Sequence, residues 1–437
     1  MSILYTFYGD DFTGSTDVLE RLGSNGVPAV LFLGPPTARH LALFPDVKAI
    51  GIAGDSRSRS PEWMSAHLPE TFRMLRDFDA PVTHYKVCST FDSSPASGSI
   101  GRAIEIGLEV FRPAFVPVVV GAPHLRRYVA FGNLFAADPD GIVQRIDRHP
   151  MSRHPVTPMH EADLRVHLAA QSELKVGLID IPMLQSGDSS EAVVSLVAAG
   201  HAAILFDTID GQTQATVGAF LWSQAQKRPL FAAGSSGLTA ALISAWRALD
   251  MLTEPPPHQP LPTSRPLLVI SGSCSEATRR QLGYALARGY RGIPLDPVAL
   301  LDRNGPARTE ALRAASQSLA AGEDTVLYTA LGPVEALAHE AGPGSELGAA
   351  LGWLLRDLLA RTGASPSPVR RVLLCGGDTA SHAVQQLGLY ALTWAANLQP
   401  GVPLCRAHAD SELHGLELVL KGGQVGSEDF FDVVRGA

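Results

Sequence analysis

The stretch ILYTFYGDDFTGSTDVLERLG, residues 3–23, joins an apolar run to a polar turn and then to an amphipathic run. Residues 3–8 are rich in apolar and aromatic side chains, which is typical of a buried strand. Apolar residues at helical spacing follow from Ser15 or Thr16, and Gly23 is available to end that helix. A strand that leads directly into a helix is the repeating unit of α/β proteins, so this stretch predicts an α/β fold.

The same alternation of strand and helix patterns continues through most of the chain. It predicts mostly parallel sheets covered by helices, because parallel strands need a long crossover connection. The predicted strands are residues 29–33, 47–53, 82–87, 116–120, 175–181, 202–206, 229–232, 267–270, 325–328 and 372–374.

A proline-rich stretch, LTEPPPHQPLPTSRP at residues 252–266, interrupts this alternation. Proline fixes φ and removes a hydrogen-bond donor, so the stretch is expected to be an extended linker. At roughly 150 residues per domain, a chain of 437 residues has room for two or three domains. We therefore predict a larger first domain at residues 1–254 and a smaller second domain at residues 255–437.

Composition excludes several classes of protein. The net charge of −8 disfavours nucleic acid as a partner, because phosphate-binding surfaces carry a basic excess. The four cysteines are widely spaced without a CxxC pair, and the histidines form no HExxH motif, so no metal site is predicted. The N-terminus lacks the features of a signal peptide and no apolar run is long enough to cross a membrane, so we expect a cytoplasmic protein.

Three small-residue turns after apolar strands mark the second half of the chain. A strand-to-helix turn directs free backbone N–H groups and the positive end of a helix dipole at one place, which suits a phosphate. The alternative is that each is an ordinary tight turn. A Walker A motif and a GxGxxG fingerprint are both missing from the sequence. The residues in question are Ser271, Gly272, Ser273 and Ser275; Gly376, Gly377, Asp378 and Thr379; and Lys421, Gly422, Gly423 and Gly426.

In the first half, Asp10 and Asp11 follow the first predicted strand, at the sheet edge where α/β proteins bind ligands. Either carboxylate could accept a proton from a substrate hydroxyl, orient that hydroxyl, or hold a metal-bound water. The alternative is that one of them caps the helix that follows.

Two further polar clusters follow the predicted strands 47–53 and 82–87. Arginine beside serine suits a bidentate grip on a carboxylate, and several hydroxyls around one lysine suggest a polyhydroxylated, anionic ligand. The alternative is a pair of solvated loops. Cys88 lies inside the second cluster and is expected to be a packing residue and not a nucleophile. The clusters contain Asp55, Arg57, Ser58 and Arg59, and Lys86, Ser89, Thr90 and Asp92.

Several segments together resemble the four-carbon acid sugar kinase family, and the resemblance spans nearly the whole chain. In the first half it rests on GDDFTGSTD at residue 9, the SRS turn at residue 56, Lys86 with Ser89 and Thr90, and MSRHPVTPMHEADLRVHLAAQ at residue 151. In the second half it rests on SGSCSEATRRQ, GGDTA and LVLKGGQVGSEDFF.

The resemblance implies two α/β domains and ATP-dependent phosphorylation of a terminal hydroxyl on a small sugar acid, usually with Mg²⁺. It also implies that the first domain holds the acid, that the second holds ATP, and that the active site lies in the cleft between them. By this resemblance Asp10, Asp11, Arg59 and Lys86 would contact the acid, one aspartate orienting or deprotonating its hydroxyl. Ser271, Ser273, Gly376 to Thr379 and Gly422 to Gly426 would contact ATP.

The sequence departs from the family pattern in the second polar cluster. The family commonly has Lys-Ile-Asp-Ser-Thr-x-Arg-Gly, whereas here Cys88 replaces the aspartate and Asp92 replaces the arginine. Gly422 and Gln424 also replace the usual serine and asparagine. We therefore infer kinase chemistry with a substrate outside the commonest set. A branched acid such as 3-oxo-isoapionate is a candidate, beside the tetronates and oxo-tetronates of the family.

Two other functions remain open at this point. The chain could be a catalytically weak binding or regulatory protein of the same fold, or a dinucleotide-dependent enzyme that lacks the usual fingerprint. The sequence does not determine the oligomeric state, and a homodimer is one possibility.

Overall fold

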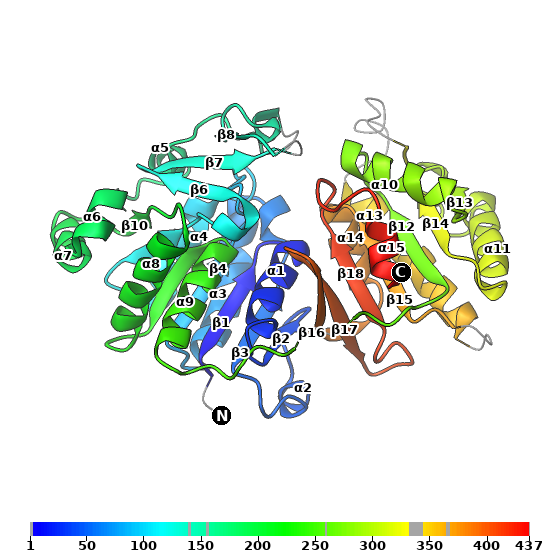
Figure 1. Ribbon diagram of the computed structural model, residues 1–437, viewed down its shortest axis with the longest axis horizontal. Helices are drawn as coiled ribbons and strands as arrows, with labels where there is room; N and C mark the ends of the chain where they lie inside the picture. Colours follow the sequence, from blue (N-terminus) through cyan, green and yellow to red (C-terminus); the bar gives the residue numbers. More distant parts are fainter. Residues whose placement is uncertain are drawn as a thin grey trace. The chain divides into compact units, whose positions relative to one another are not determined.

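The computed structural model describes residues 3–138, 141–153, 157–257, 260–331, 344–363 and 368–436 (Figure 1). The chain forms two compact units, one of Met1–Val30 and Gly34–Pro256, the other of Leu31–Leu33 and Pro257–Ala437. Both units are built from mostly parallel strands with helices between them, which confirms the predicted α/β class.

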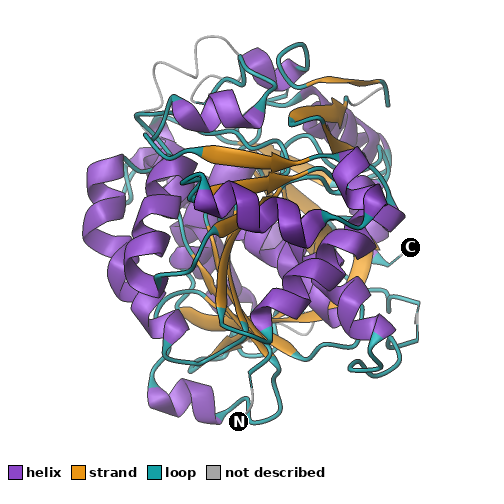
Figure 2. Cartoon of the chain, turned by 90° about the vertical axis from the view of Figure 1, so that its left-hand side faces the viewer, coloured by secondary structure: helices purple, strands orange, loops and turns teal. Residues whose placement is uncertain are grey.

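The first unit contains a parallel sheet in the order β3-β1-β4-β11-β5-β10-β9. Helices cover this sheet, as Figure 2 shows for this side of the molecule. The strands are β1 (Tyr5–Gly9), β3 (Ala49–Ala53), β4 (Val82–Lys86), β5 (Val116–Val119), β9 (Val176–Ile179), β10 (Ala203–Phe206) and β11 (Leu230–Gly234). The helices are α1 (Phe12–Gly23), α2 (Ala38–Ala42), α3 (Pro61–Arg76), α4 (Ile100–Phe111), α5 (Leu164–Ala169), α6 (Ile181–Ser186), α7 (Ser189–Ala198), α8 (Gly211–Ala225) and α9 (Ser236–Ala248).

A separate antiparallel sheet of three short strands was not predicted from the sequence. It consists of β6 (Arg127–Ala130), β7 (Asn133–Ala137) and β8 (Val143–Arg145). The described residues also form four short 3₁₀ turns. The first unit contains η1 (Ser56–Ser58), η2 (Pro123–Leu125) and η3 (Pro150–Arg153), and the second unit contains η4 (Ala299–Leu301).

The second unit contains a sheet in the order β13-β14-β12-β15-β18-β17-β16. The first five strands are parallel, and β17 and β16 form an antiparallel hairpin that the sequence pattern did not predict. Leu31 and Phe32 of β2 (Ala29–Phe32) pair with β16, which groups them with this unit. The strands are β12 (Leu267–Ser271), β13 (Arg291–Pro294), β14 (Thr325–Tyr328), β15 (Arg371–Cys375), β16 (Leu389–Gln399), β17 (Val402–Ala409) and β18 (Glu417–Lys421), and the helices are α10 (Glu276–Ala287), α11 (Pro306–Ala320), α13 (Gly344–Thr362), α14 (Gly377–Gln385) and α15 (Phe430–Arg435).

The core of the first unit lies between the sheet and an apolar stripe of helix α3. Its side chains Leu68, Phe72 and Leu75 are buried at helical spacing. Phe72 packs 5.2 Å from Phe231 of β11, measured between ring centroids. This packing fixes α3 against the sheet and so holds the turn that precedes it, which carries Arg57.

Two further features concern the proline-rich stretch and the length of the helices. The stretch 252–266 contains neither helix nor strand in its described residues 252–257 and 260–266. None of the helices formed by the described residues is long and apolar enough to span a membrane.

Candidate functional site

Three strands of the first unit end side by side, and the residues that follow them carry the predicted polar clusters. Gly9 at the end of β1 pairs with Lys86 at the end of β4, and Lys86 also pairs with Gly234 at the end of β11. Asp10 follows β1 directly, and its backbone carbonyl accepts a hydrogen bond from Arg57. The fold therefore gathers residues distant in sequence at the carboxyl edge of the sheet, where parallel α/β sheets bind ligands.

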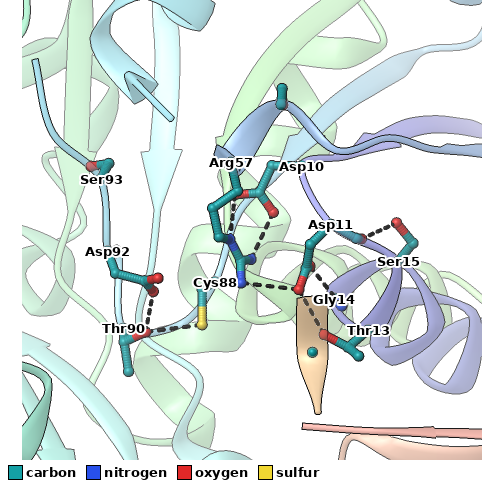
Figure 3. A network of polar contacts seen from close by, with 12 residues as sticks. Asp10, Asp11, Thr13, Gly14, Ser15, Arg57, Cys88, Thr90, Asp92 and Ser93 are labelled. Atoms are coloured by element: carbon teal, nitrogen blue, oxygen red, sulfur yellow. Dashed lines mark hydrogen bonds and ion pairs between the residues drawn. The ribbon is translucent and has the colours of Figure 1, made fainter. Parts of the chain in front are cut away.

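Arg57 holds both aspartates (Figure 3). Its Nη2 and Nε atoms donate to the two carboxylate oxygens of Asp10 at 2.8 and 3.1 Å. Its Nη1 lies 3.0 Å from Oδ2 of Asp11. Burial raises the pKa of the Asp10 carboxyl to about 6, although the Arg57 guanidinium opposes this rise. One partly buried arginine thus keeps two adjacent carboxylates together.

Asp11 is the N-cap of helix α1, one of the two alternatives left open by the sequence. Its Oδ1 accepts a hydrogen bond from the backbone N–H of Gly14 at 2.8 Å, and its Oδ2 accepts one from the Thr13 hydroxyl at 2.6 Å. This cap starts the helix at Phe12, three residues before the predicted start at Ser15. The carboxylate of Asp11 therefore joins the helix N-terminus to Arg57.

Asp55, Ser58 and Arg59 form local contacts and do not join this network. The guanidinium of Arg59 pairs with the carboxylate of Asp55, four residues earlier, and lies over the ring of Trp63. The hydroxyl of Ser58, which is exposed, donates to the carbonyl of Asp55. The sequence assigned carboxylate binding to this turn as a whole, and the resemblance favoured Arg59, whereas the structure places Arg57 at the sheet edge.

Lys86 carries a buried ammonium group without a hydrogen bond or ion pair to any described residue. The residue is 2% exposed. Its Nζ atom lies close to helix α1, since a Cβ atom placed on Gly14 would come within 2.8 Å of it. A buried cation that lacks an acceptor is costly. The ammonium group of Lys86 is therefore a candidate partner for an anionic group of a ligand.

The segment that contains the two departures from the family pattern is closely held. The Thr90 hydroxyl donates to Oδ1 of Asp92 at 2.5 Å and lies 2.9 Å from Sγ of Cys88. Burial and the neighbouring Asp92 raise the pKa of the Cys88 thiol, so it is protonated at neutral pH. Ser89 also lies in this segment, where it is partly buried.

His167 and Gln171 hold the end of the same segment, and the sequence patterns did not single them out. The Ser93 hydroxyl lies 2.9 Å from Nε2 of His167 and accepts a hydrogen bond from Nε2 of Gln171 at 2.8 Å. Burial lowers the pKa of His167 to about 4, so the imidazole is neutral at physiological pH. A neutral ring can accept on one nitrogen and donate from the other, as this position requires.

In the second unit, the three predicted turns converge at the ends of adjacent parallel strands. Ser271 of β12 pairs with Cys375 of β15, which pairs with Lys421 of β18 (Figure 1). A Cβ atom placed on Gly272 would lie 2.5 Å from the Thr379 hydroxyl, and one on Gly423 would lie 2.8 Å from the Ser273 hydroxyl. Glycine is thus required for the three turns to approach so closely.

Helix α14 begins without a side-chain cap. Its N-cap residue, Gly376, has a φ of +112°, a conformation that favours glycine, and supplies no side-chain hydrogen bond. The first-turn backbone N–H groups of Gly377 and Thr379 donate to no acceptor outside the helix among the described residues. Uncapped N–H groups at a helix N-terminus form a ready site for phosphate.

Lys421 uses its ammonium group within the protein. Its Nζ atom donates to the carbonyls of Gly422 and Val425 at 3.0 and 3.1 Å and to the Thr278 hydroxyl at 3.1 Å. The residue is fully buried, and this burial lowers its pKa. Because all three protons are engaged, Lys421 holds the shape of the loop around Gly422, Gly423 and Gly426. The sequence had suggested a free charge for phosphate, and the structure does not support that role.

The remaining predicted site features are Ser271, the loop after Lys421, Asp378 and Ser275. Ser271 is fully buried and its hydroxyl has no hydrogen-bond partner among the described residues, so the side chain lies in the core and not at the turn surface. The loop after Lys421 leads to α15 only at Phe430 and is not a direct strand-to-helix turn. The side chain of Asp378 lies outside the described part of the chain. Ser275 caps helix α10 and also donates to the carbonyl of Gly423.

The sequence interpretation overlooked a fourth small-residue turn, GSSG at residues 234–237. It follows β11 and opens helix α9 beside Lys86, because Gly234 and Lys86 are register partners. Ser235 caps the helix and Ser236 is fully buried. The sequence signal for this turn is glycine and serine between a strand and a helix, the same pattern that predicted the turns in the second half of the chain.

Among the described residues, no group of three or more histidine, cysteine, aspartate or glutamate side chains is arranged to hold a metal ion.

Residues 5–242 match the family described as "Sugar-binding N-terminal domain", and residues 268–431 match the one described as "Nucleotide-binding C-terminal domain". The chain belongs to the four-carbon acid sugar kinase family. As a member of this family it is a sugar-acid kinase.

Individual relatives extend along the whole chain. The chain is 45% identical to a 3-oxo-isoapionate kinase of Paraburkholderia graminis over 99% of its own length and 94% of that protein. It is 30% identical to a 3-oxo-tetronate kinase of Pectobacterium atrosepticum over 97% of its length and 96% of that protein. A crystal structure of a Haemophilus influenzae protein, from a family catalogued as a domain of unknown function, superposes with a TM-score of 0.72 at 26% identity and covers 99% of both chains.

Proposed function

We propose that this family member transfers the γ-phosphoryl group of ATP to a hydroxyl of 3-oxo-isoapionate or a closely similar branched 3-oxo sugar acid. The observation that carries this proposal is the 45% identity to a 3-oxo-isoapionate kinase over almost the full length, against about 30% for a 3-oxo-tetronate kinase. The replacement of the family aspartate and arginine by Cys88 and Asp92 supports a substrate different from the tetronates.

Each unit has a separate role in this proposal. Residues 1–254 bind the sugar acid through side chains at the carboxyl edge of their sheet, with the Lys86 ammonium opposite an anionic group. Residues 255–437 bind ATP through the backbone N–H groups of the turns at Gly272, Gly376 and Gly422. That these two half-sites meet in an inter-domain cleft stays a prediction.

The nucleotide half of the site fits a triphosphate. The uncapped first turn of α14 offers backbone N–H groups to phosphate oxygens, and the glycines at residues 272, 376 and 423 let the three turns lie close together around it. Mg²⁺, when bound with ATP, neutralises charge on the β- and γ-phosphates, and it commonly takes only one or two protein carboxylates beside phosphate oxygens and waters.

In the transfer, the substrate hydroxyl oxygen forms a bond to the γ-phosphorus as the bond from that phosphorus to the β,γ-bridging oxygen breaks, and ADP leaves with this oxygen. The hydroxyl proton needs an acceptor. We assign it to Asp10, whose pKa of about 6 lies near neutral pH. Asp11 keeps Arg57 and helix α1 in place beside it. Phosphoryl transfer through a loose transition state depends mainly on positioning and charge neutralisation.

An ADP-release assay with ATP and Mg²⁺ tests the proposal. The panel contains 3-oxo-isoapionate, 3-oxo-tetronates, threonate and erythronate. We expect kcat/KM for 3-oxo-isoapionate to exceed that for each tetronate at least about tenfold, the factor expected from a few well-placed polar contacts. A preference for a tetronate would overturn the substrate assignment. Nucleotide binding with no ADP release on any acid would favour a regulatory protein of the same fold.

The variant Asp92→Arg sharpens this assay because it restores the residue that is common in the family. We expect it to reduce activity on 3-oxo-isoapionate while ATP affinity is unchanged. If Asp92→Arg and the wild type were equally active on every acid of the panel, Asp92 would have no role in substrate choice.

A further inference from the structure

Helix α1 and the turn η2 carry a polar cluster of Asp17, Arg21 and His124, which the predicted site residues do not include. Asp17 is 8% exposed, and its Oδ1 atom is buried without a hydrogen-bond partner among the described residues. The same holds for Nε of Arg21 and for both ring nitrogens of His124. Buried polar atoms in folded proteins are nearly always paired, so four such atoms in one cluster require an explanation.

The three side chains lie close enough to act on one another. Both the Asp17 carboxylate and the Arg21 guanidinium affect the titration of His124, in opposite directions. Burial has the larger effect and lowers the pKa of His124 to about 4, so the ring is neutral at physiological pH. A neutral imidazole has one N–H donor and one acceptor nitrogen, and both are unmatched here.

The cluster continues the face of α1 that borders the sugar-acid half-site. Gly14, where the Lys86 ammonium lies, Asp17 and Arg21 are spaced three and four residues apart, so they share one face of the helix. At about 1.5 Å per residue, Asp17 lies about 4.5 Å along the helix from Gly14 and Arg21 about 10 Å from it. The unmatched polar groups therefore form a row that begins at Lys86.

The chemistry of the cluster selects the kind of ligand. A carboxylate accepts hydrogen bonds, a guanidinium donates them, and a neutral imidazole can do both. The carboxylate and the guanidinium also cancel in charge, so the cluster gives an anion no net attraction. A hydroxyl group, which both donates and accepts, can satisfy such a set, and water fills the same positions when no ligand is present.

We propose that Asp17, Arg21 and His124 form a subsite for the non-reacting hydroxyl groups of the sugar acid, while Lys86 binds its anionic end. This inference rests on the proposed function and adds the part of the site that recognises the polyol portion of the substrate.

The test exploits a property of unmatched polar groups. Such groups lower the stability of the ligand-free protein, so replacing them with apolar or isosteric side chains should not destabilise it if they serve a ligand. The variants are His124→Leu and Asp17→Asn. Asp79→Asn is the matched control, because Asp79 is an exposed aspartate for which an isosteric amide is tolerated at its positive φ.

The measurements are urea denaturation of the full-length ligand-free protein, and KM and kcat for 3-oxo-isoapionate and for ATP. We expect His124→Leu to raise the urea midpoint, and both variants to raise KM for the acid about tenfold or more with KM for ATP unchanged. Asp79→Asn should change neither quantity.

Unchanged KM for the acid in both variants, in an enzyme whose wild type phosphorylates it, would overturn the subsite and leave the proposed function standing. A marked fall in the urea midpoint of both variants with an unchanged KM would likewise overturn it in favour of a structural role. Absence of activity in the wild type on every acid would instead count against the proposed function. Isothermal titration of the acid into each variant without nucleotide gives a second readout that does not depend on turnover.

Discussion

The two half-sites offer different kinds of chemical group to a ligand. In the first unit, charged side chains at the sheet edge hold one another, with Arg57 between Asp10 and Asp11. In the second unit, the available groups are backbone N–H donors at glycine-rich turns, and the one buried lysine, Lys421, faces inward to the loop carbonyls. The first site therefore depends on side-chain identity and the second on backbone conformation.

This difference explains where substrate preference can change. A site built from side chains can change its ligand when a single residue is replaced, which is the role that we propose for Cys88 and Asp92. A site built from main-chain donors depends instead on the loop conformation, which its glycines and its internal hydrogen bonds maintain. Variants in each unit test this difference.

Arg57→Ala should have the largest effect. Removal of one partner from a buried ion pair leaves two carboxylates without their counter-charge, which costs about 3 kcal/mol of unfolding free energy. We also expect loss of acid-dependent ADP release. Urea denaturation and the ADP-release assay measure both effects.

Arg59→Ala is the matched control for Arg57→Ala, since its side chain is 41% exposed and its partners among the described residues are Asp55 and Trp63. It should cost less than about 1 kcal/mol. Equal losses in the two variants would contradict the central position of Arg57.

Lys421→Met should weaken ATP binding about tenfold or more while leaving acid affinity intact. The substitution leaves two carbonyls and the Thr278 hydroxyl without their donor, so the loop at residues 422–426 loses its shape. Calorimetric titration with a non-hydrolysable ATP analogue measures the change. Lys227→Met, at an exposed position, is the control. Undiminished ATP affinity would show that this loop does not contact the nucleotide.

Gly376→Ala should reduce ATP affinity several-fold and destabilise the protein by about 1–2 kcal/mol, the cost of a Cβ atom at positive φ. The new Cβ atom would lie 3.2 Å from the Thr379 hydroxyl at the start of α14. Gly388→Ala has a similar backbone cost, with a φ of +68° and open space around it, so it should leave ATP affinity unchanged. A parallel loss of affinity in both variants would indicate a general effect of stability.

The smallest effect concerns pH. Burial raises the pKa of Asp10 from 3.8 to about 6, so the folded protein takes up a proton as the pH falls through 6. Its ionisation therefore costs stability above pH 6, and this cost is relieved as the pH falls towards 4. At pH 6 about half of Asp10 is protonated, and the rate should be about half of that at pH 8.

Asp10→Asn tests the assignment of this pH effect. The decrease in stability between pH 4 and 6 that Asp10 causes should vanish in the variant, as measured by denaturation at several pH values. A wild-type rate that is flat between pH 6 and 8 would contradict the role of Asp10 as proton acceptor.

Local patterns predicted the parallel strands well because buried strands are short apolar runs bounded by turn residues. They failed for the hairpin of β16 and β17 and for the sheet of β6, β7 and β8. Most residues of β16 and β6 are only partly buried, so these strands lack the continuous buried run of the parallel strands. The start of α1 was predicted three residues late because Asp11 was open to two interpretations, and only its hydrogen bond to Gly14 decides between them.

The sequence by itself determined the α/β class, the family and the two sets of turns that carry the polar residues, because these depend on local pattern and on motifs. Only the tertiary structure decided that Arg57 and not Arg59 reaches Asp10, that the hydrogen bonds of Lys421 go to loop carbonyls and Thr278, and that His124 lies near Asp17 and Arg21. Side-chain pairing of this kind depends on which strand ends adjoin in the sheet. That order is set by long-range packing, which residue spacing along the chain does not record.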